Sequence, residues 1–176
     1  MPEQEEIYQS QAEGYDRLIQ REDYKGNLLP ALNAIVPLRG TEVIDIGAGT
    51  GRFACLLASI ARRIVGLDRS MAMLRVARSK LEHQASDAWR LSVGDNRALP
   101  ISPDAADVVL AGWTFGHATV WYEDHWREEI DPSIREMMRL LRPGGTAIIC
   151  ETLGTGARHP APPTTVLHAY YRFLET

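Results

Sequence analysis

Apolar residues along the chain form two kinds of pattern, short concentrated runs and longer segments with helical spacing. The short runs predict buried strands over Thr41–Ile46, Ile64–Asp68, Arg90–Gly94, Ala106–Ala111 and Thr146–Glu151. The helical spacing predicts helices over 27–36, from the residues after Gly51 to about Arg62, over 71–82 with Ser70 as N-cap, and up to about Arg142. Strands that alternate with helices in this way predict an α/β fold with a Rossmann-like, doubly wound and mostly parallel sheet.

The length of 176 residues corresponds to one domain. We expect residues 1–26 to form an N-terminal arm or short amphipathic helix, because their apolar positions are sparse. Residues 27–151 hold all the predicted strands and should form the ligand-binding core. Residues 152–176 begin with a proline-containing loop and end in a predicted helix, whose apolar stripe comprises Val166, Leu167, Tyr170, Tyr171 and Leu174.

The net charge of -4 gives no overall basic surface for nucleic acid or for an anionic membrane. No segment has the length of a membrane span, and the acidic N-terminus MPEQEEIYQS does not resemble a signal peptide. The two cysteines and five histidines lack metal-ligand spacing. We therefore expect a cytoplasmic protein without a metal site. A local basic patch could still be present in an acidic chain, so a tRNA or a protein remains an alternative substrate.

Residues 43–53, VIDIGAGTGRF, place three glycines directly after the first strand. Such a turn lets the backbone approach a ligand closely, and the amides that begin the next helix attract an anion. A P-loop is excluded because no lysine and hydroxyl residue follow Gly51, and a dinucleotide site lacks its third glycine because Arg52 stands there. Asp45 would repel a pyrophosphate and attract an ammonium group. The turn therefore favours a ligand with an amino-acid end and a nucleoside end, such as S-adenosylmethionine.

Five segments resemble, in order, the motifs of class I S-adenosylmethionine-dependent methyltransferases: VIDIGAGTGRF, VGLDRSMAML, VGDNRALPI, ADVVLAG and RLLRPGG. The resemblance covers roughly residues 8–151, and five ordered motifs are more specific than one glycine motif. It implies that a methyl group is transferred by SN2 displacement, with S-adenosylhomocysteine as the other product. We expect the acceptor to be a small molecule.

The resemblance also implies which residues hold the methyl donor. Those implied for the methionine end are Asp45, the backbone of Gly47, Ala48 and Gly49, and, near the sulfonium, Ala111 and Gly112. A tyrosine of the arm, Tyr8 or Tyr15, covers this end in many relatives, although both also fit plain packing roles. Those implied for the nucleoside end are Asp68 with Arg69 at the ribose hydroxyls, and Asp95 with Asn96 at the adenine. Asp95, in the turn-like GDN, fits a plain turn residue equally well.

Aromatic residues are concentrated after the fourth strand, in the segment 113–126, WTFGHATVWYEDHW. At the carboxyl end of a strand they would wall off a pocket that excludes water, which favours methyl transfer. Trp113 and His117 are the candidates for contact with the acceptor, and His117 is also a candidate general base. For Trp121 and Trp126, the anchoring of the next helix onto the sheet is the favoured role. Methyl transfer to a carbon or a thiolate can proceed by in-line positioning without a base.

Members of this family continue past the fifth strand with a helix and an antiparallel hairpin. The residues after Glu151 leave room for the helix alone. We therefore expect a C-terminally truncated chain, with strand 146–151 exposed at the sheet edge and available for homodimerisation. Two alternatives to a methyltransferase stay open, a non-catalytic or truncation-inactivated S-adenosylmethionine-binding protein and a nicotinamide-dependent oxidoreductase.

Overall fold

The structure, a computed structural model, describes residues 11–23, 25–122, 124–154 and 158–175, so that Tyr8 lies outside the described residues. Its elements are, in chain order, α2 (Ala12–Ile19), α3 (Leu28–Ile35), β1 (Glu42–Ile46), α4 (Arg52–Leu57), β2 (Arg63–Asp68), α5 (Met71–Glu82), β3 (Trp89–Val93), β4 (Ala106–Gly112), the 3-10 helix η1 (Phe115–His117), α6 (Ala118–Trp121), α7 (Trp126–Leu140), β5 (Leu141–Cys150) and α8 (Thr165–Leu174). Within the described ranges, no helix combines the length and the apolarity needed to cross a membrane.

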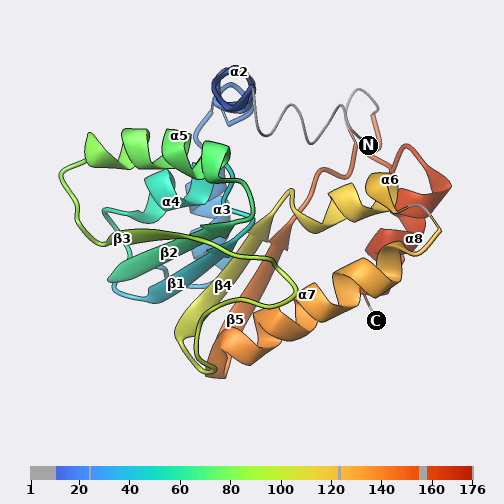
Figure 1. The fold of residues 1–176 in the computed structure, drawn as a ribbon. Helices are drawn as coiled ribbons and strands as arrows, with labels where there is room; N and C mark the ends of the chain where they lie inside the picture. Colours follow the sequence, from blue (N-terminus) through green and yellow to red (C-terminus); the bar gives the residue numbers. More distant parts are fainter. Residues whose placement is uncertain (1–10, 24, 123, 155–157, 176) are drawn as a thin grey trace.

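The strands form one parallel sheet in the order β3-β2-β1-β4-β5 (Figure 1). The central strand β1 pairs with β2 on one side and with β4 on the other. The chain therefore runs outward from β1 to β3 and then returns to begin β4 beside β1. This reversal confirms the predicted doubly wound α/β fold, and in such sheets ligands bind beyond the carboxyl ends of the strands at the reversal.

Helices cover both faces of the sheet (Figure 1). Side chains of β1 and β4 alternate between two apolar cores, one on each of these faces. Val43 and Leu110 face the core formed with α3, α4 and α5, whereas Ile44 and Val109 face the core formed with α7 and α8. Because both faces are covered, apolar residues are needed on both sides of these strands, which explains why Val43 and Ile44, and the apolar residues 108–111, follow one another without alternation. The same alternation turns Asp45 toward α4, on the side of Val43.

The helix after the glycine turn is shorter than predicted, because α4 ends at Leu57 and not near Arg62. Gly40 donates its backbone N–H to the Ile60 carbonyl, and Arg62 donates to the Thr41 carbonyl. These bonds draw the chain alongside the start of β1 and allow β2 to begin at Arg63. Ile60 has helical spacing from the apolar face of α4 but packs against the same core from a turn. The helical spacing of Ile60 therefore predicted the C-terminal end of α4 incorrectly.

The fifth strand is longer than predicted, and the Pro143-Gly144-Gly145 segment is part of it. Helix α7 ends at Leu140, and Leu141 already pairs with Ala106. The register then shifts between Ala106 and Val108, so the glycines form an irregularity inside β5 and not a turn ahead of it. The other predicted strands, and the helices over 27–36 and 71–82, agree with the structure to within one residue at each end.

Strand β5 lies at one edge of the sheet, since among the described residues it pairs with β4 alone. Its outer backbone groups therefore face away from the sheet, as expected for 146–151, and pairing with a second copy stays a prediction. Helix α8 packs beside it with Tyr170 fully buried. The Tyr170 ring meets Trp126 edge-on at a centroid distance of 5.9 Å, so Trp126 anchors α7 and α8 to each other.

Gly51, at the start of α4, provides a test of local packing. Its φ is +82°, and a Cβ added there would lie 2.8 Å from the Ala77 Cβ of α5. We expect Gly51→Ala to lower the free energy of unfolding by about 2–5 kcal/mol, because a left-handed backbone costs about 1–2 and a core clash about 1–3. Gly40→Ala is the matched control, since its φ is +77° and nothing lies within 4 Å. Equal losses in urea denaturation of the two variants would contradict the packing contribution.

Candidate functional site

A cavity of about 360 Å³ lies beyond the carboxyl ends of β1, β2 and β4, a size that suits a small-molecule ligand. The predicted site residues that line it are Tyr15, Asp45, Gly47, Ala48, Gly49, Asp68, Arg69, Asp95, Asn96, Gly112, Trp113 and His117. Ala111, expected beside the sulfonium, does not line the cavity. It is fully buried in the core under α7, because the alternation of β4 turns it to that face.

The glycine turn between β1 and α4 is held to the end of β2 by the Asp68 carboxylate. The Gly49 N–H donates to Asp68 Oδ2 at 2.8 Å, and the Ser70 N–H donates to Oδ1 at 2.7 Å. A carboxylate oxygen accepts two hydrogen bonds, so each oxygen has capacity for a further donor from the cavity. Gly47 lies against Thr114, whose Cγ2 and Oγ1 would be 2.4 Å from an added Cβ. Only glycine permits this close approach.

Asp45 is 1% exposed in the central strand and lines the cavity. Its Oδ2 atom has no hydrogen-bond partner among the described residues, and the same holds for Thr50 Oγ1. The pKa of Asp45 is raised to about 8, mainly by burial and also by the charge of Asp68, and the backbone N–H of Ala54 partly counteracts this rise. A ligand that brings a cationic donor to this oxygen would supply both the missing hydrogen bond and the counter-charge.

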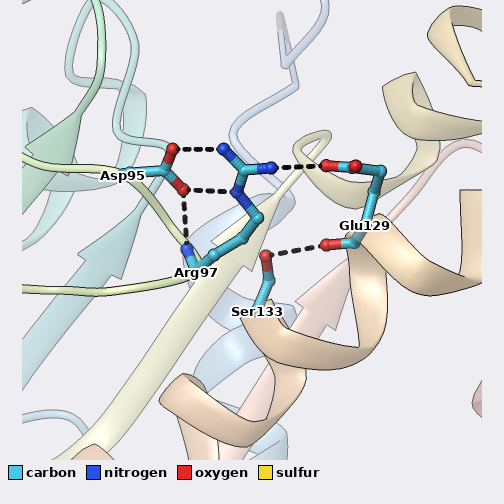
Figure 2. Close-up of polar contacts among 4 residues, drawn as sticks. All are labelled: Asp95, Arg97, Glu129 and Ser133. Carbon is cyan, nitrogen blue, oxygen red and sulfur yellow. Dashed lines mark hydrogen bonds and ion pairs between the residues drawn. The ribbon is translucent and has the colours of Figure 1, made fainter.

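Asp95 is held by Arg97, two residues further along the same turn (Figure 2). The guanidinium also holds the pKa of the Asp95 carboxyl below its ordinary value. At its other end Arg97 Nη1 donates to Glu129 Oε2 at 2.7 Å. Arg97 therefore joins the loop after β3 to α7, and all three side chains line the cavity.

Helix α2 and the residues after it cover the cavity and are fastened by charged groups. The Asp16 carboxylate, 6% exposed, accepts a hydrogen bond from Lys80 Nζ of α5 at 2.5 Å. Arg52 Nη2 of α4 donates to the Ile19 carbonyl at 3.2 Å and pairs with the Glu22 carboxylate. The arginine that excludes a dinucleotide motif thus ties the N-terminal arm to α4.

Trp113 is fixed in the cavity wall from several sides. Its ring stacks on Phe53 at a centroid distance of 6.0 Å, and the guanidinium carbon of Arg52 lies 4.2 Å from the ring centroid. The indole Nε1 donates to Thr152 Oγ1 at 2.8 Å. Its φ of +52° is uncommon for a bulky residue, so these contacts hold the backbone in a conformation that it would not adopt alone.

His117 lines the cavity at the end of η1. Its ring stacks on Trp121, with centroids 5.2 Å apart and planes 12° from parallel. Burial lowers its pKa, and a hydrogen bond to the Thr114 backbone counteracts this. At neutral pH the imidazole is therefore uncharged, and an uncharged imidazole can accept a proton at one of its ring nitrogens.

Several cavity residues were not among the predicted site residues, notably Arg97, Glu129 and Ser133. Glu129 and Ser133 line the cavity because α7 packs over one face of the sheet, an arrangement that the local sequence does not specify. For Ser133 the sequence did contain an indication, because a small polar residue occupies a position on the apolar, buried face of α7 that Ile130 and Met137 form. Among the described residues, no cluster of three or more histidine, cysteine or acidic side chains is arranged to hold a metal ion.

The model of a family described as a methyltransferase domain matches residues 44–149. The chain belongs to this family. The family match favours the methyltransferase over the oxidoreductase alternative, in agreement with the motifs in the sequence.

Two curated relatives and one solved structure illustrate the similarity of this methyltransferase domain. The malonyl-[acyl-carrier protein] O-methyltransferase of Methylococcus capsulatus is 34% identical over 138 residues, covering 76% of this chain and 46% of that protein. The demethylmenaquinone methyltransferase of Clavibacter sepedonicus is 31% identical over 120 residues, covering 67% and 44%. The phosphoethanolamine N-methyltransferase 1 of Haemonchus contortus, with a TM-score of 0.59 at 22% identity over 77% of this chain and 28% of that one, shares the fold. The chain thus spans less than half the length of these curated relatives.

The raised pKa of Asp45 predicts a stability that depends on pH. In the unfolded chain the carboxyl ionises near its ordinary pKa of 3.8, but in the folded protein only near 8. The folded state therefore binds more protons across this range, and the free energy of unfolding falls as the pH rises from about 4 to about 8. Asp45→Asn removes the charge and should stabilise the ligand-free protein by an amount that grows between about pH 5 and 8. A gain independent of pH in urea denaturation would contradict this.

Proposed function

We propose that this domain is an S-adenosylmethionine-dependent methyltransferase acting on a small-molecule acceptor. The observation that carries the proposal is the row of carboxylates at three strand ends, Asp45, Asp68 and Asp95, all lining one cavity. Such a site repels a pyrophosphate and favours a ligand with an ammonium group and neutral hydroxyl and amino donors. Family membership supports the proposal. The Haemonchus contortus enzyme, which shares the fold, was solved with S-adenosylhomocysteine.

The residues of the cavity fit this donor along its length. The unpartnered Oδ2 of Asp45 matches the α-ammonium, and the backbone amides of the turn from Gly47 to Gly49 match the carboxylate. The remaining capacity of Asp68 matches the ribose hydroxyls, and Asp95 matches the adenine amino group. Tyr15 of α2 also lines the cavity and matches the tyrosine that covers the methionine end in many relatives. When bound, the donor supplies a methyl group made electrophilic by its sulfonium.

The chain's own residues would exclude water from the acceptor and receive its proton. The aromatic side chains that line the cavity after β4 are Trp113, Phe115, Trp121 and Tyr122. Their exclusion of water favours the reaction, because the charge of the sulfonium is lost as the methyl group moves. His117 lines the cavity, and burial lowers its pKa, so that the uncharged ring would accept the proton that an acceptor hydroxyl, amine or carbon releases.

Two observations support the proposed class of acceptor, the aromatic lining of the cavity and the substrates named for the relatives. The names of the two curated relatives give malonyl-acyl carrier protein and demethylmenaquinone as their substrates. Aromatic walls favour a small apolar group over a polymer. A malonyl thioester and demethylmenaquinone are therefore the first acceptors to test.

Calorimetric titration with S-adenosylhomocysteine tests the donor site. We expect the parent protein to bind it and Asp68→Ala to weaken the affinity by about 1.5–3 kcal/mol, the contribution of hydrogen bonds to a charged acceptor. Asp87→Ala, which removes an exposed carboxylate ahead of β3 at the opposite end of the sheet, is the control and should bind like the parent. Absence of heat with both S-adenosylmethionine and S-adenosylhomocysteine would overturn the proposal. An unchanged affinity in Asp68→Ala would place the ribose elsewhere.

Formation of S-adenosylhomocysteine in the presence of either acceptor tests turnover and separates the enzyme from a non-catalytic binding protein. With demethylmenaquinone, whose methylation releases a proton, we expect His117→Gln to lower kcat by about 10²–10⁴-fold and to leave the affinity for S-adenosylhomocysteine unchanged. A malonyl carboxylate is already ionised at neutral pH and releases no proton, so its methylation should not depend on His117 as a base. Because burial lowers the pKa of His117 from its ordinary 6.5, the parent rate should decline only below pH 6.5. His125→Gln, an exposed histidine outside the cavity, is the control. A parental kcat in His117→Gln would exclude it as the base.

A further inference from the structure

The Asp95 carboxylate has a fixed orientation because Arg97 binds it through three nitrogen atoms. Oδ1 accepts hydrogen bonds from the backbone N–H and the Nε of Arg97, both at 2.9 Å, and Oδ2 accepts one from Nη2 at 2.8 Å. Oδ1 thereby uses both its lone pairs, and Oδ2 keeps one beyond these bonds. Without this contact, a half-exposed aspartate would sample several rotamers.

The other end of Arg97 is fixed as well. Figure 2 shows the guanidinium between two carboxylates, that of Asp95 on the loop after β3 and that of Glu129 on α7. The Ser133 hydroxyl donates to the Glu129 carbonyl at 3.3 Å, one turn along the same helix. All four residues line the cavity. Arg97 is therefore anchored on the loop and on the helix at once.

An ion pair of this exposure contributes little to stability. The side chains of Asp95 and Arg97 are 50% and 48% exposed, and exposed pairs are screened by water and salt, so they contribute little to the free energy of unfolding. What a bidentate arginine–carboxylate pair does provide is a defined geometry. The main effect of the network is thus on the direction in which Asp95 presents its remaining lone pair to the cavity.

We propose that Arg97 is a positioning residue that selects the base of the methyl donor. It holds Asp95 so that Oδ2 accepts a hydrogen bond from the 6-amino group of adenine. Hypoxanthine has a carbonyl oxygen at this position, which cannot donate a hydrogen bond to the carboxylate. A donor that carries hypoxanthine should therefore bind more weakly. The inference rests on the proposed function and on the predicted role of Asp95.

Titration with S-adenosylhomocysteine and with S-inosylhomocysteine, which carries hypoxanthine, measures this selection as a ratio of dissociation constants. We expect the parent protein to prefer the adenine compound by roughly tenfold or more, as for one hydrogen bond to a charged group. The ratio should fall below about threefold in Arg97→Gln and in Arg97→Lys, which keeps the charge but loses the planar fork. Arg135→Gln is the matched control, because it removes another exposed arginine that pairs with an aspartate, Asp131 on α7. It should keep the parental ratio.

The outcomes are separable once circular dichroism has shown the variants to be folded. A parental ratio in Arg97→Gln and Arg97→Lys would overturn the inference, as would binding of both compounds by the parent without preference. Glu129→Gln removes only the helix anchor and should lower the ratio less than Arg97→Gln. An equal loss would assign the effect to α7 and not to Asp95. Failure of the parent to bind either compound would instead contradict the proposed function.

Discussion

Asp45 lies in the central strand between apolar neighbours, where it is 1% exposed and where one of its oxygens has no partner among the described residues. Leaving a buried polar group unsatisfied costs about 1–3 kcal/mol, and more for a charged one. The cost appears in the ligand-free protein as a pKa shifted to about 8. A ligand that brings a positively charged donor to this point recovers that free energy on binding. The glycine turn and Asp68 are arranged around it, so the ligand preference of the cavity begins with this one carboxylate.

The fold was predictable from the chain because its main determinants are local. Strands β1 and β4 are covered on both faces and show this as short, concentrated runs of apolar residues. The Ser70 hydroxyl caps α5 by accepting a hydrogen bond from the Met73 N–H, as its position in the sequence predicted. The structure differs from the prediction where the backbone pairs with a segment that is distant in the sequence. Arg62 pairs with Thr41 and shortens α4, and Leu141 pairs with Ala106 and lengthens β5 at the expense of the predicted turn. Neither pairing has a signal within its own segment.

The residues of the candidate site also fall into those that the sequence predicted and those that it did not. Asp45, Asp68 and the glycines stand at strand ends, where the topology itself brings them together, so their positions at the cavity followed from the pattern of strands. Arg97 appeared in the sequence only as part of a motif, because its partner Glu129 lies 32 residues further along. Arg52 was recognised only as an obstacle to another motif, whereas in the fold it contacts both Trp113 and the N-terminal arm. Ala111 was assigned to the wall from its place at the strand end, but strand alternation buries it.

Helix α2 and the residues after it, which cover the cavity, are held by two ion pairs that differ in their exposure to solvent. The Asp16–Lys80 pair is largely shielded, with the Asp16 side chain 8% exposed, whereas the Glu22 side chain that meets Arg52 is 52% exposed. Dissolved ions weaken exposed charge pairs much more than shielded ones, since the Debye length falls from about 10 Å at 0.1 M to about 3 Å at 1 M. Concentrated salt should therefore loosen the arm at its Glu22 end first and leave it pivoting on Asp16. The residence time of a bound ligand would then shorten with ionic strength while the sheet beneath stays intact.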